Sequence, residues 1–377
     1  MVLDPARDSW LRDHRPTYTI PVLPLMSMAD LVAGWAQQAG GGRAVEIADM
    51  NVRRWVTFAA GPRRLDARVL PRSDGWVEVR VAVEDEAGQP ENVSTGRVRL
   101  AGQYERPRNW ELEPLETPTP IERPYAGGRL FHGRSFHVVE SLTLGRNGSS
   151  AVLRAEARGV PAGVLNPAVL DGVTHAIPAD DLARWSPMLG GDEVAFPARI
   201  AKLLLHSPPP VAGDVRSEVR FAGLTDGDRR FPAVRALLSS ADGPWADLTL
   251  VLRLFPKGPL GSAAPAQREA FLRDRRYVPG VALSRVAGAA TRLNVRDVIR
   301  SDWLPGTLAA IYGAGGDADA LAAQIAVKEH AARRLRVHPS EIRVSPGLDY
   351  AELQAAPARG MAVRVRREGR EVVVEDG

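Results

Sequence analysis

Hydrophobic and polar residues alternate along much of the first 256 residues, which predicts short antiparallel strands. The alternation is clearest at residues 76–81, where the valines at 77, 79 and 81 are separated by charged residues. One apolar helix precedes the strands of this half, from about Met26 to the glycines at 40–42, which favour a helix end. The strands predicted here are residues 44–58, 63–70, 75–84 and 92–100.

The same order of elements recurs after a proline-rich stretch at 111–124, which is typical of an extended linker. Strands are predicted within 130–158, then a helix over 166–185. Further strands are predicted at 193–206, 214–221, 229–238 and 245–255. This recurrence indicates an internal duplication. A long antiparallel sheet wrapped around one buried helix is a hot-dog unit, so we predict an α+β double hot dog, with two antiparallel sheets that each wrap a central helix.

The composition changes after residue 256. Residues 257–267 are rich in Gly, Ala and Pro and read as a second linker, and a smaller α+β domain is predicted beyond it, with a helix at 317–335 and a hairpin of 362–366 with 371–374. The predicted organisation is a first hot dog at 1–110, a linker at 111–128, a second hot dog at 129–257 and a small domain at 268–377.

Composition and charge exclude several classes of site. The chain has 377 residues and no cysteine, which excludes disulfides, thiolate metal sites and cysteine nucleophiles. No signal-peptide pattern and no apolar run of roughly 18 residues occur, so we expect a cytoplasmic protein without membrane contact. The net charge is +4 and the arginines are scattered, which argues against nucleic-acid binding. These arginines form either an ordinary solvated surface or a basic face for an acidic partner.

The candidate chemistry comes from one histidine in the first half and an acid in the second. His14 precedes the apolar stretch 21–24, whereas Asp171 and His175 are four residues apart and share one face of the predicted helix. A duplicated fold would place these groups on opposite walls of a shared cleft. Histidine suits a general base, and an aspartic acid in an apolar tunnel would have a raised pKa and could deliver a proton. The simpler alternatives are a loop histidine, a helix-terminal acid and a packed core histidine.

The chain resembles the dehydratase domain of polyketide synthases over residues 5–256. Residues 166–175, NPAVLDGVTH, match that family's aspartate motif, and residues 10–14 with 22–24 resemble its H-x-x-x-G-x-x-x-x-P histidine motif. Residues 130–136, LFHGRSF, and 196–200, FPARI, resemble its turn and its following strand. Two departures occur: Tyr18 stands at the glycine position, and Pro24 follows His14 by ten residues.

The resemblance implies removal of water from a β-hydroxyacyl thioester. The thioester is carried on the phosphopantetheine of an acyl carrier protein, with no bound cofactor or metal. The implied partners are that carrier, the other synthase domains and a second copy in a homodimer. In this hypothesis His14 is the base, Asp171 the acid and His175 orients Asp171, while the start of the predicted helix offers N–H groups to the thioester carbonyl. The side chains assigned to the substrate tunnel are Tyr18, Pro24, Gly133 and Phe136, of which Tyr18 and Phe136 could equally be core residues.

The other histidines carry no predicted site. His132 and His137 are predicted to be sheet residues, and His206, His330 and His338 lack the spacing of zinc ligands.

The C-terminal region resembles a phosphopantetheinyl transferase at residues 326–335, where Glu329 matches a magnesium-binding glutamate. Such a domain follows the dehydratase in enediyne-type iterative synthases. Residues 280–284 lack the acid that the transferase motif requires, and magnesium needs more than one carboxylate oxygen. We therefore expect a degenerate domain without transferase activity.

Two alternative functions use the same residues differently. A product-template-like cyclase would use the same His/Asp pair for ring formation, and a non-catalytic scaffold domain of a synthase would not need the pair at all.

Overall fold

The computed structural model describes residues 1–14, 16, 21–58, 61–84, 89–125, 130–156, 159–191, 193–256, 285–287, 289–294, 323, 326, 327, 330, 331, 334, 342–344, 352–355 and 359–377. Tyr18, Glu329 and most of the helix predicted at 317–335 lie outside these residues.

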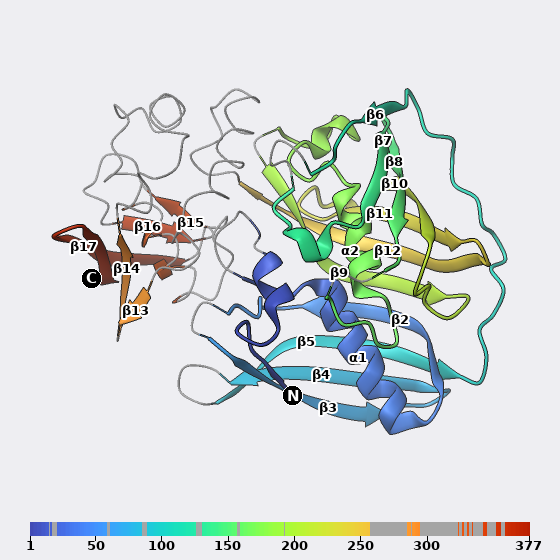
Figure 1. Ribbon diagram of the computed structural model, residues 1–377, viewed down its shortest axis with the longest axis horizontal. Coiled ribbons are helices and arrows are strands. Elements are labelled where there is room, and N and C mark those ends of the chain that lie inside the picture. The colour runs from blue at the N-terminus through green and yellow to red at the C-terminus, as the bar shows by residue number, and fades with distance from the viewer. Residues whose placement is uncertain are drawn as a thin grey trace.

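One twelve-stranded antiparallel sheet contains both halves of the duplicated region (Figure 1), with strands in the order β1-β3-β4-β5-β2-β9-β12-β11-β10-β8-β7-β6. The first half contributes β1 (Val2–Leu3), β2 (Arg43–Val52), β3 (Arg63–Pro71), β4 (Trp76–Glu84) and β5 (Pro90–Ala101). The second half contributes β6 (Thr119–Ile121), β7 (Val139–Leu144), β8 (Gly148–Arg154), β9 (Glu193–Leu205), β10 (Asp214–Leu224), β11 (Pro232–Ser240) and β12 (Gly243–Pro256).

The two halves join through β2 and β9. These strands pair antiparallel, with Ile47 opposite Leu203, and both side chains are fully buried. The two predicted sheets are therefore continuous, each half curving around its own helix, in a double hot dog.

The first of these helices is α1 (Leu25–Gly40), which packs against β2 to β5 and lies across them in Figure 1. Its buried apolar side chains follow the helical repeat and are Met26, Met28, Ala29, Val32, Ala33 and Ala36. The helix ends at Gly41, whose φ of 71° is left-handed and favours glycine. The predicted helix and its glycine stop are confirmed.

The second helix, α2 (Pro167–His175), packs against β8, β10 and α1. The prediction of a helix reaching residue 185 is wrong, because α2 ends at His175 and Pro178 then removes a backbone donor. Residues Leu182–Arg184 form only a short 3-10 turn, η5. Gly172 allows α2 to pack closely, since a Cβ there would lie 2.6 Å from Val138 Cγ2.

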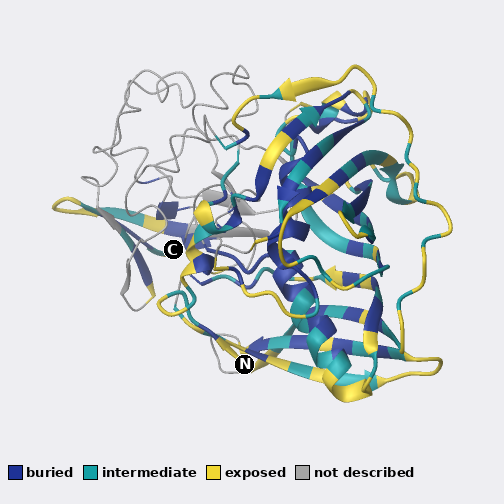
Figure 2. Cartoon of the chain, turned by 45° about the vertical axis from the view of Figure 1, so that its right-hand side comes forward, coloured by how far each residue is buried: buried dark blue, intermediate teal, exposed yellow. Residues whose placement is uncertain are grey.

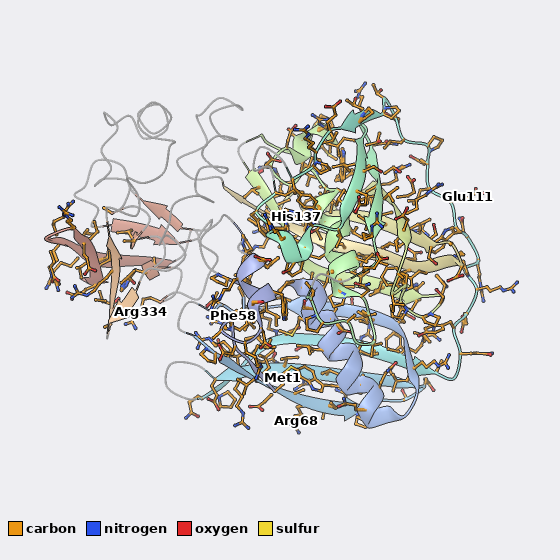
Figure 3. All side chains as sticks on the ribbon, viewed as in Figure 1. Met1, Phe58, Arg68, Glu111, His137 and Arg334 are labelled. Atoms are coloured by element: carbon orange, nitrogen blue, oxygen red, sulfur yellow. The ribbon has the colours of Figure 1, made fainter. Side chains whose placement is uncertain are left out.

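The predicted linker at 111–124 is largely extended, but it also contains β6, which pairs with β7 so that Ile121 lies opposite Leu142. Figure 3 labels Glu111 on this connection, which runs along the periphery of the molecule. The linker therefore adds an edge strand to the sheet.

Side chains from both halves form one hydrophobic core. Its buried members run from Leu3 to Leu254 and include α1, α2 and alternate positions of most strands. Figure 2 shows that alternation as dark blue beside exposed yellow or intermediate teal along the strands. Because the core is shared, the two halves form a single packing unit. Among the described residues, no helix is both long and apolar enough to cross a membrane.

The C-terminal region contains a second antiparallel sheet of six strands in the order β13-β14-β18-β17-β16-β15. Their bounds are β13 (Arg285–Ala287), β14 (Ala290–Asn294), β15 (Ile342–Val344), β16 (Glu352–Ala355), β17 (Arg359–Glu368) and β18 (Glu371–Asp376). The predicted hairpin is confirmed as β17 and β18, with Val365 opposite Val374. Buried His330 lies between Thr291 Oγ1, at 3.1 Å, and Asp376 Oδ1, at 3.0 Å.

Candidate active site

A cavity of about 150 Å³ lies between the two halves, lined by α1, the end of β2, β7, α2 and the start of β9. Its walls are mostly apolar, and the lining includes Met26, Leu142 and Phe196. The ionisable side chains in the lining are His14, Arg54, His132, Asp171, His175 and Asp180. Four of these, His14, His132, Asp171 and His175, lie close together in the mostly apolar cavity.

His14 directly follows the short 3-10 turn η1 (Ser9–Asp13) and is only 8% exposed. Its ring Nδ1 lies 2.9 Å from the Val22 carbonyl oxygen, an acceptor, so Nδ1 carries the proton and Nε2 holds the free lone pair. Burial lowers the pKa of His14, and the nearby charge of Asp171 only partly opposes this effect. The imidazole is therefore neutral at neutral pH, the form that a base requires.

Asp13, the residue before His14, holds its loop against residues 133–135 of the second half. The Gly133 N–H donates to the Asp13 carbonyl oxygen at 2.7 Å, and the Ser135 N–H donates to Asp13 Oδ2 at 2.9 Å. A Cβ at position 133 would lie 2.2 Å from Asp13 Oδ1, so only glycine allows this approach. Gly133 thus brings two loops together and is absent from the cavity lining, contrary to its predicted tunnel position.

Asp171 and His175 project from the same face of α2, as their spacing predicts. His175 Nε2 lies 3.3 Å from Asp171 Oδ2, and the two residues are 2% and 3% exposed. Asp171 is the fifth residue of α2, so it lies one turn in from the N-terminal end of the helix. At that end, the Val169 N–H donates to Asn166 Oδ1 at 3.3 Å.

Tyr125, which sequence reasoning missed, lies against the ring of His175. Its hydroxyl oxygen accepts the N–H groups of Val138 and Val139, both at 3.0 Å, and lies 2.9 Å from His175 Nδ1. The hydroxyl itself donates to the Phe136 carbonyl oxygen at 3.1 Å. His175 is thus held between the Tyr125 hydroxyl, on the Nδ1 side, and the Asp171 carboxyl, on the Nε2 side.

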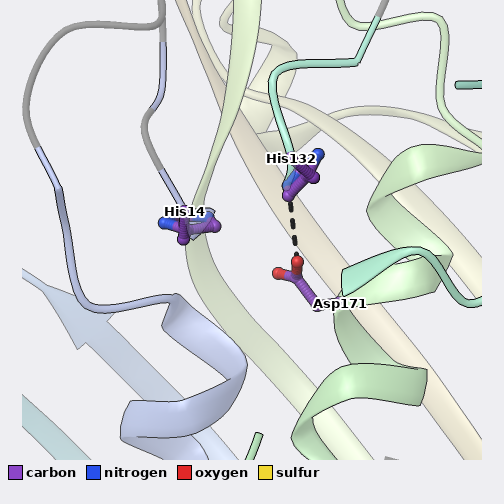
Figure 4. Close-up of side chains that lie close together, drawn as sticks. All are labelled: His14, His132 and Asp171. Atoms are coloured by element: carbon purple, nitrogen blue, oxygen red, sulfur yellow. Dashed lines mark ion pairs between the residues drawn. The ribbon is translucent and has the colours of Figure 1, made fainter. Parts of the chain in front are cut away.

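His132 is the second residue that sequence reasoning missed. Its Nε2 lies 3.4 Å from Asp171 Oδ2 (Figure 4), and the residue is 3% exposed. Its ring stacks on Phe131 with a centroid separation of 3.9 Å and contacts the ring of His175 at 3.8 Å. The prediction of a sheet residue is wrong, since His132 lies in the loop before the 3-10 turn η4 (Arg134–Phe136). The feature of the sequence that could have indicated His132 is the glycine that follows it. Gly133 allows the loop that carries His14 to come close to His132.

His137 is likewise not a sheet residue; it caps the C-terminal end of η4. Its Nε2 donates to the His132 carbonyl oxygen at 3.0 Å, and its ring stacks on Tyr125 at 3.9 Å. His137 therefore supports the loop that carries His132.

The remaining predicted tunnel residues lie behind the cavity wall or outside the described chain. Phe136 is fully buried, and its ring centroid lies 5.7 Å from that of His14. Its ring therefore packs against the imidazole of His14. Pro24 is the N-cap residue of α1 and is absent from the lining. Tyr18 lies outside the described residues.

The same cluster has the composition of a metal site. His14, His132 and Asp171 each offer one ligand atom, and these atoms all lie within 4.8 Å of one another. Among the described residues this is the one group of three or more such side chains found close enough to hold an ion.

No protein-family model and no curated protein matches this chain. Solved structures do match. The dehydratase domain from the CurJ module of curacin polyketide synthase has a TM-score of 0.54 at 16% identity, covering 67% of this chain and 89% of that chain. The dehydratase domain of the polyketide synthase PpsC from Mycobacterium tuberculosis has a TM-score of 0.53 at 16% identity, covering 68% and 91%. A further PpsC dehydratase structure, in complex with C12:1-CoA, has a TM-score of 0.51 at 18% identity, covering 67% and 91%. The first 256 residues of this chain therefore have the double-hot-dog fold of polyketide synthase dehydratase domains.

Proposed function

We propose that this chain removes water from a β-hydroxyacyl thioester to give the enoyl thioester, as a dehydratase of polyketide biosynthesis. The observation that carries the proposal is the convergence of His14, from the first half, and Asp171, from the second half, in one apolar cavity. The resemblance in sequence and the likeness in fold both support it.

The proposed mechanism assigns one proton transfer to each of these residues. Neutral His14 takes the α-proton of the thioester on Nε2, and the electron pair of the broken C–H bond forms the new double bond. The β-C–O bond breaks as protonated Asp171 gives its proton to the departing hydroxyl, which leaves as water. The cycle ends with imidazolium and carboxylate, and transfer of a proton from His14 to Asp171 restores both groups.

His175 and Tyr125 hold Asp171 in this mechanism. The Tyr125 hydroxyl lies 2.9 Å from His175 Nδ1, and His175 Nε2 lies 3.3 Å from Oδ2 of Asp171. This chain of hydrogen bonds fixes which carboxyl oxygen faces the substrate and stabilises the carboxylate that remains after proton transfer.

Intact-protein mass spectrometry of a β-hydroxyacyl carrier protein incubated with this chain tests the proposal. We expect a loss of about 18 Da from the acyl carrier, and no loss with His14→Ala or Asp171→Asn. His206→Ala is the matched control, because that histidine bonds the Glu105 carbonyl outside the cavity and should leave the reaction unchanged.

The same measurement separates the two alternatives. A cyclase that works by addition would consume the substrate without a mass change, which chromatography of the released product would detect. A scaffold domain would leave every acyl chain unchanged, and His14→Ala would then not alter the output of the synthase. Either result would overturn the dehydratase proposal.

We propose further that the substrate arrives on the phosphopantetheine of an acyl carrier protein, and that the chain works beside other synthase domains as a cytoplasmic homodimer. The proposal divides the chain into hot dogs at 1–110 and 129–257, a linker at 111–128 and a C-terminal domain at 268–377. The enediyne-type assignment, with a degenerate transferase-like domain, rests on the sequence resemblance at 326–335 and stands as part of this proposal.

A further inference from the structure

We propose that His14, His132 and Asp171 together form a binding site for a divalent transition-metal ion of the Zn²⁺ type, which competes with the acyl substrate. All three residues are buried, at 8%, 3% and 3% exposure, and each presents a ligand atom within 4.8 Å of the others. The metal site rests on this geometry alone, whereas the competition rests on the proposed function.

The spacing of the ligand atoms is close to that of a tetrahedral site. Zinc binds histidine nitrogen and carboxylate oxygen at about 2.0 to 2.2 Å, which places neighbouring ligands about 3.4 Å apart. His132 Nε2 and Asp171 Oδ2 are 3.4 Å apart. The ligand atom of His14 lies within 4.8 Å of the other two, so a shift of up to about 1.4 Å would complete the three-ligand set.

The neighbours of His14 and Asp171 orient these two residues as metal ligands require. A ligating histidine generally donates its other ring N–H to a carbonyl or carboxylate, which fixes the tautomer. His14 does this through Nδ1 to the Val22 carbonyl oxygen at 2.9 Å. Asp171 Oδ2 lies 3.3 Å from His175 Nε2, so a hydrogen bond already holds the carboxyl group in place.

The donor set determines the class of ion. Two imidazoles and one carboxylate favour Zn²⁺, Co²⁺ or a similar borderline ion, whereas Mg²⁺ and Ca²⁺ prefer sites built from oxygen alone. The cavity leaves the fourth position open to water or to another small ligand. Binding would engage the lone pair of His14 and the carboxylate of Asp171, which are the two groups that the dehydration uses.

Cobalt titration of the full chain without an affinity tag provides the test, since Co²⁺ in a site of four or five ligands absorbs visible light. We expect one Co²⁺ per chain, displaced by equimolar Zn²⁺. His132→Phe keeps the aromatic contacts but removes a ligand, so we expect its affinity to fall by more than about tenfold, because even outer-shell partners contribute that much. His206→Phe is the control, and its affinity should equal that of the parent.

A second ligand variant keeps the result interpretable if His132→Phe does not fold. Asp171→Asn should weaken Co²⁺ binding similarly while circular dichroism reports the fold. Saturating absorption bands that are unchanged in both folded variants, or no bands in the parent, would overturn the metal site. Zn²⁺ that binds without slowing an observed dehydration would overturn the competition only. Zn²⁺ binding to a chain that dehydrates nothing would leave the site standing and reject the proposed function.

Discussion

Gly133 marks the point where the loop that carries His14 meets the loop that carries His132. The contact is made by backbone, through the Gly133 N–H and the Asp13 carbonyl oxygen at 2.7 Å. The Asp13 carboxylate closes over the same residue and accepts the Ser135 N–H. One absent side chain thus permits the two halves of the candidate site to meet, and a larger residue would separate them.

We expect Gly133→Ala to slow dehydration by about 10- to 100-fold, because a displacement of about 1 Å can cost that much in rate. Its Cβ would lie 2.2 Å from Asp13 Oδ1, so one of the loops has to move. The free energy of unfolding should also fall by about 1–3 kcal/mol. Mass spectrometry of the acyl carrier and urea denaturation measure the two effects.

Gly34→Ala in α1 is the control, since no atom lies within 4 Å of the added methyl group. It should raise the free energy of unfolding by about 0.5–1 kcal/mol and leave the rate unchanged. Equal activity of the two alanine variants would contradict the role given to Gly133.

At the scale of elements, α2 is a short helix whose position depends on its first residues. Asn166 is 2% exposed and accepts the Val169 N–H through Oδ1, while Pro167 supplies a backbone already suited to the first turn. The Asn166 amide also donates to the carbonyl oxygens of Ala155, at 2.8 Å, and Pro210, at 3.0 Å. The residue therefore caps α2 and also ties it to two neighbouring segments.

Substitutions at position 166 separate these two roles. Asn166→Ala should lower the free energy of unfolding by about 2–4 kcal/mol, because it removes the cap and leaves buried carbonyl groups without their donor. Asn166→Asp keeps the cap but cannot donate, so most of this loss should remain. Thermal and urea denaturation measure both variants. Full recovery in Asn166→Asp would show that capping alone matters.

At the scale of the whole molecule, one carboxylate connects the helix of the first half to the loop that leads into α2. Asp30 of α1 accepts the Leu165 N–H at 2.7 Å, and burial raises its pKa to about 6 in spite of the backbone donors from 163–165, which lower it. Since an unfolded aspartate has a pKa near 3.8, the folded chain binds this proton more strongly. Asp30 therefore adds stability below about pH 4, and this contribution is lost as the pH rises to about 6 and beyond.

A comparison of Asp30→Asn with the parent protein between pH 4 and pH 8 tests whether the pKa of Asp30 is raised in the folded chain. The difference in the free energy of unfolding between the two proteins should change by up to about 3 kcal/mol between pH 4 and pH 8, in the direction that favours the variant at high pH. Chemical denaturation at fixed pH values measures it. A difference that stays constant with pH would show that Asp30 titrates as in the unfolded chain.

The predictable part of the fold was the set of helices and strands whose hydrophobic residues recur at a regular short spacing. The alternation of valines at 77, 79 and 81 fixed β4, and the helical spacing of Met26, Ala29 and Ala33 with the glycines after them fixed α1. The spacing of Asp171 and His175 likewise fixed their common face. These features depend on backbone periodicity, which a local stretch of residues specifies without help from the rest of the chain.

The tertiary structure decided what depends on contacts between distant residues. His132 and Tyr125 carry no periodic signal, and they reach Asp171 and His175 only because their loops fold over α2. The pairing of β2 with β9 joins residues about 150 positions apart. This pairing connects the sheets of the two halves into a single sheet. The sequence by itself determined most elements of the duplicated region and the two sides of the candidate site, His14 and Asp171. Their distance, their burial and the further histidine beside them came from packing, because each is a property of the space between segments.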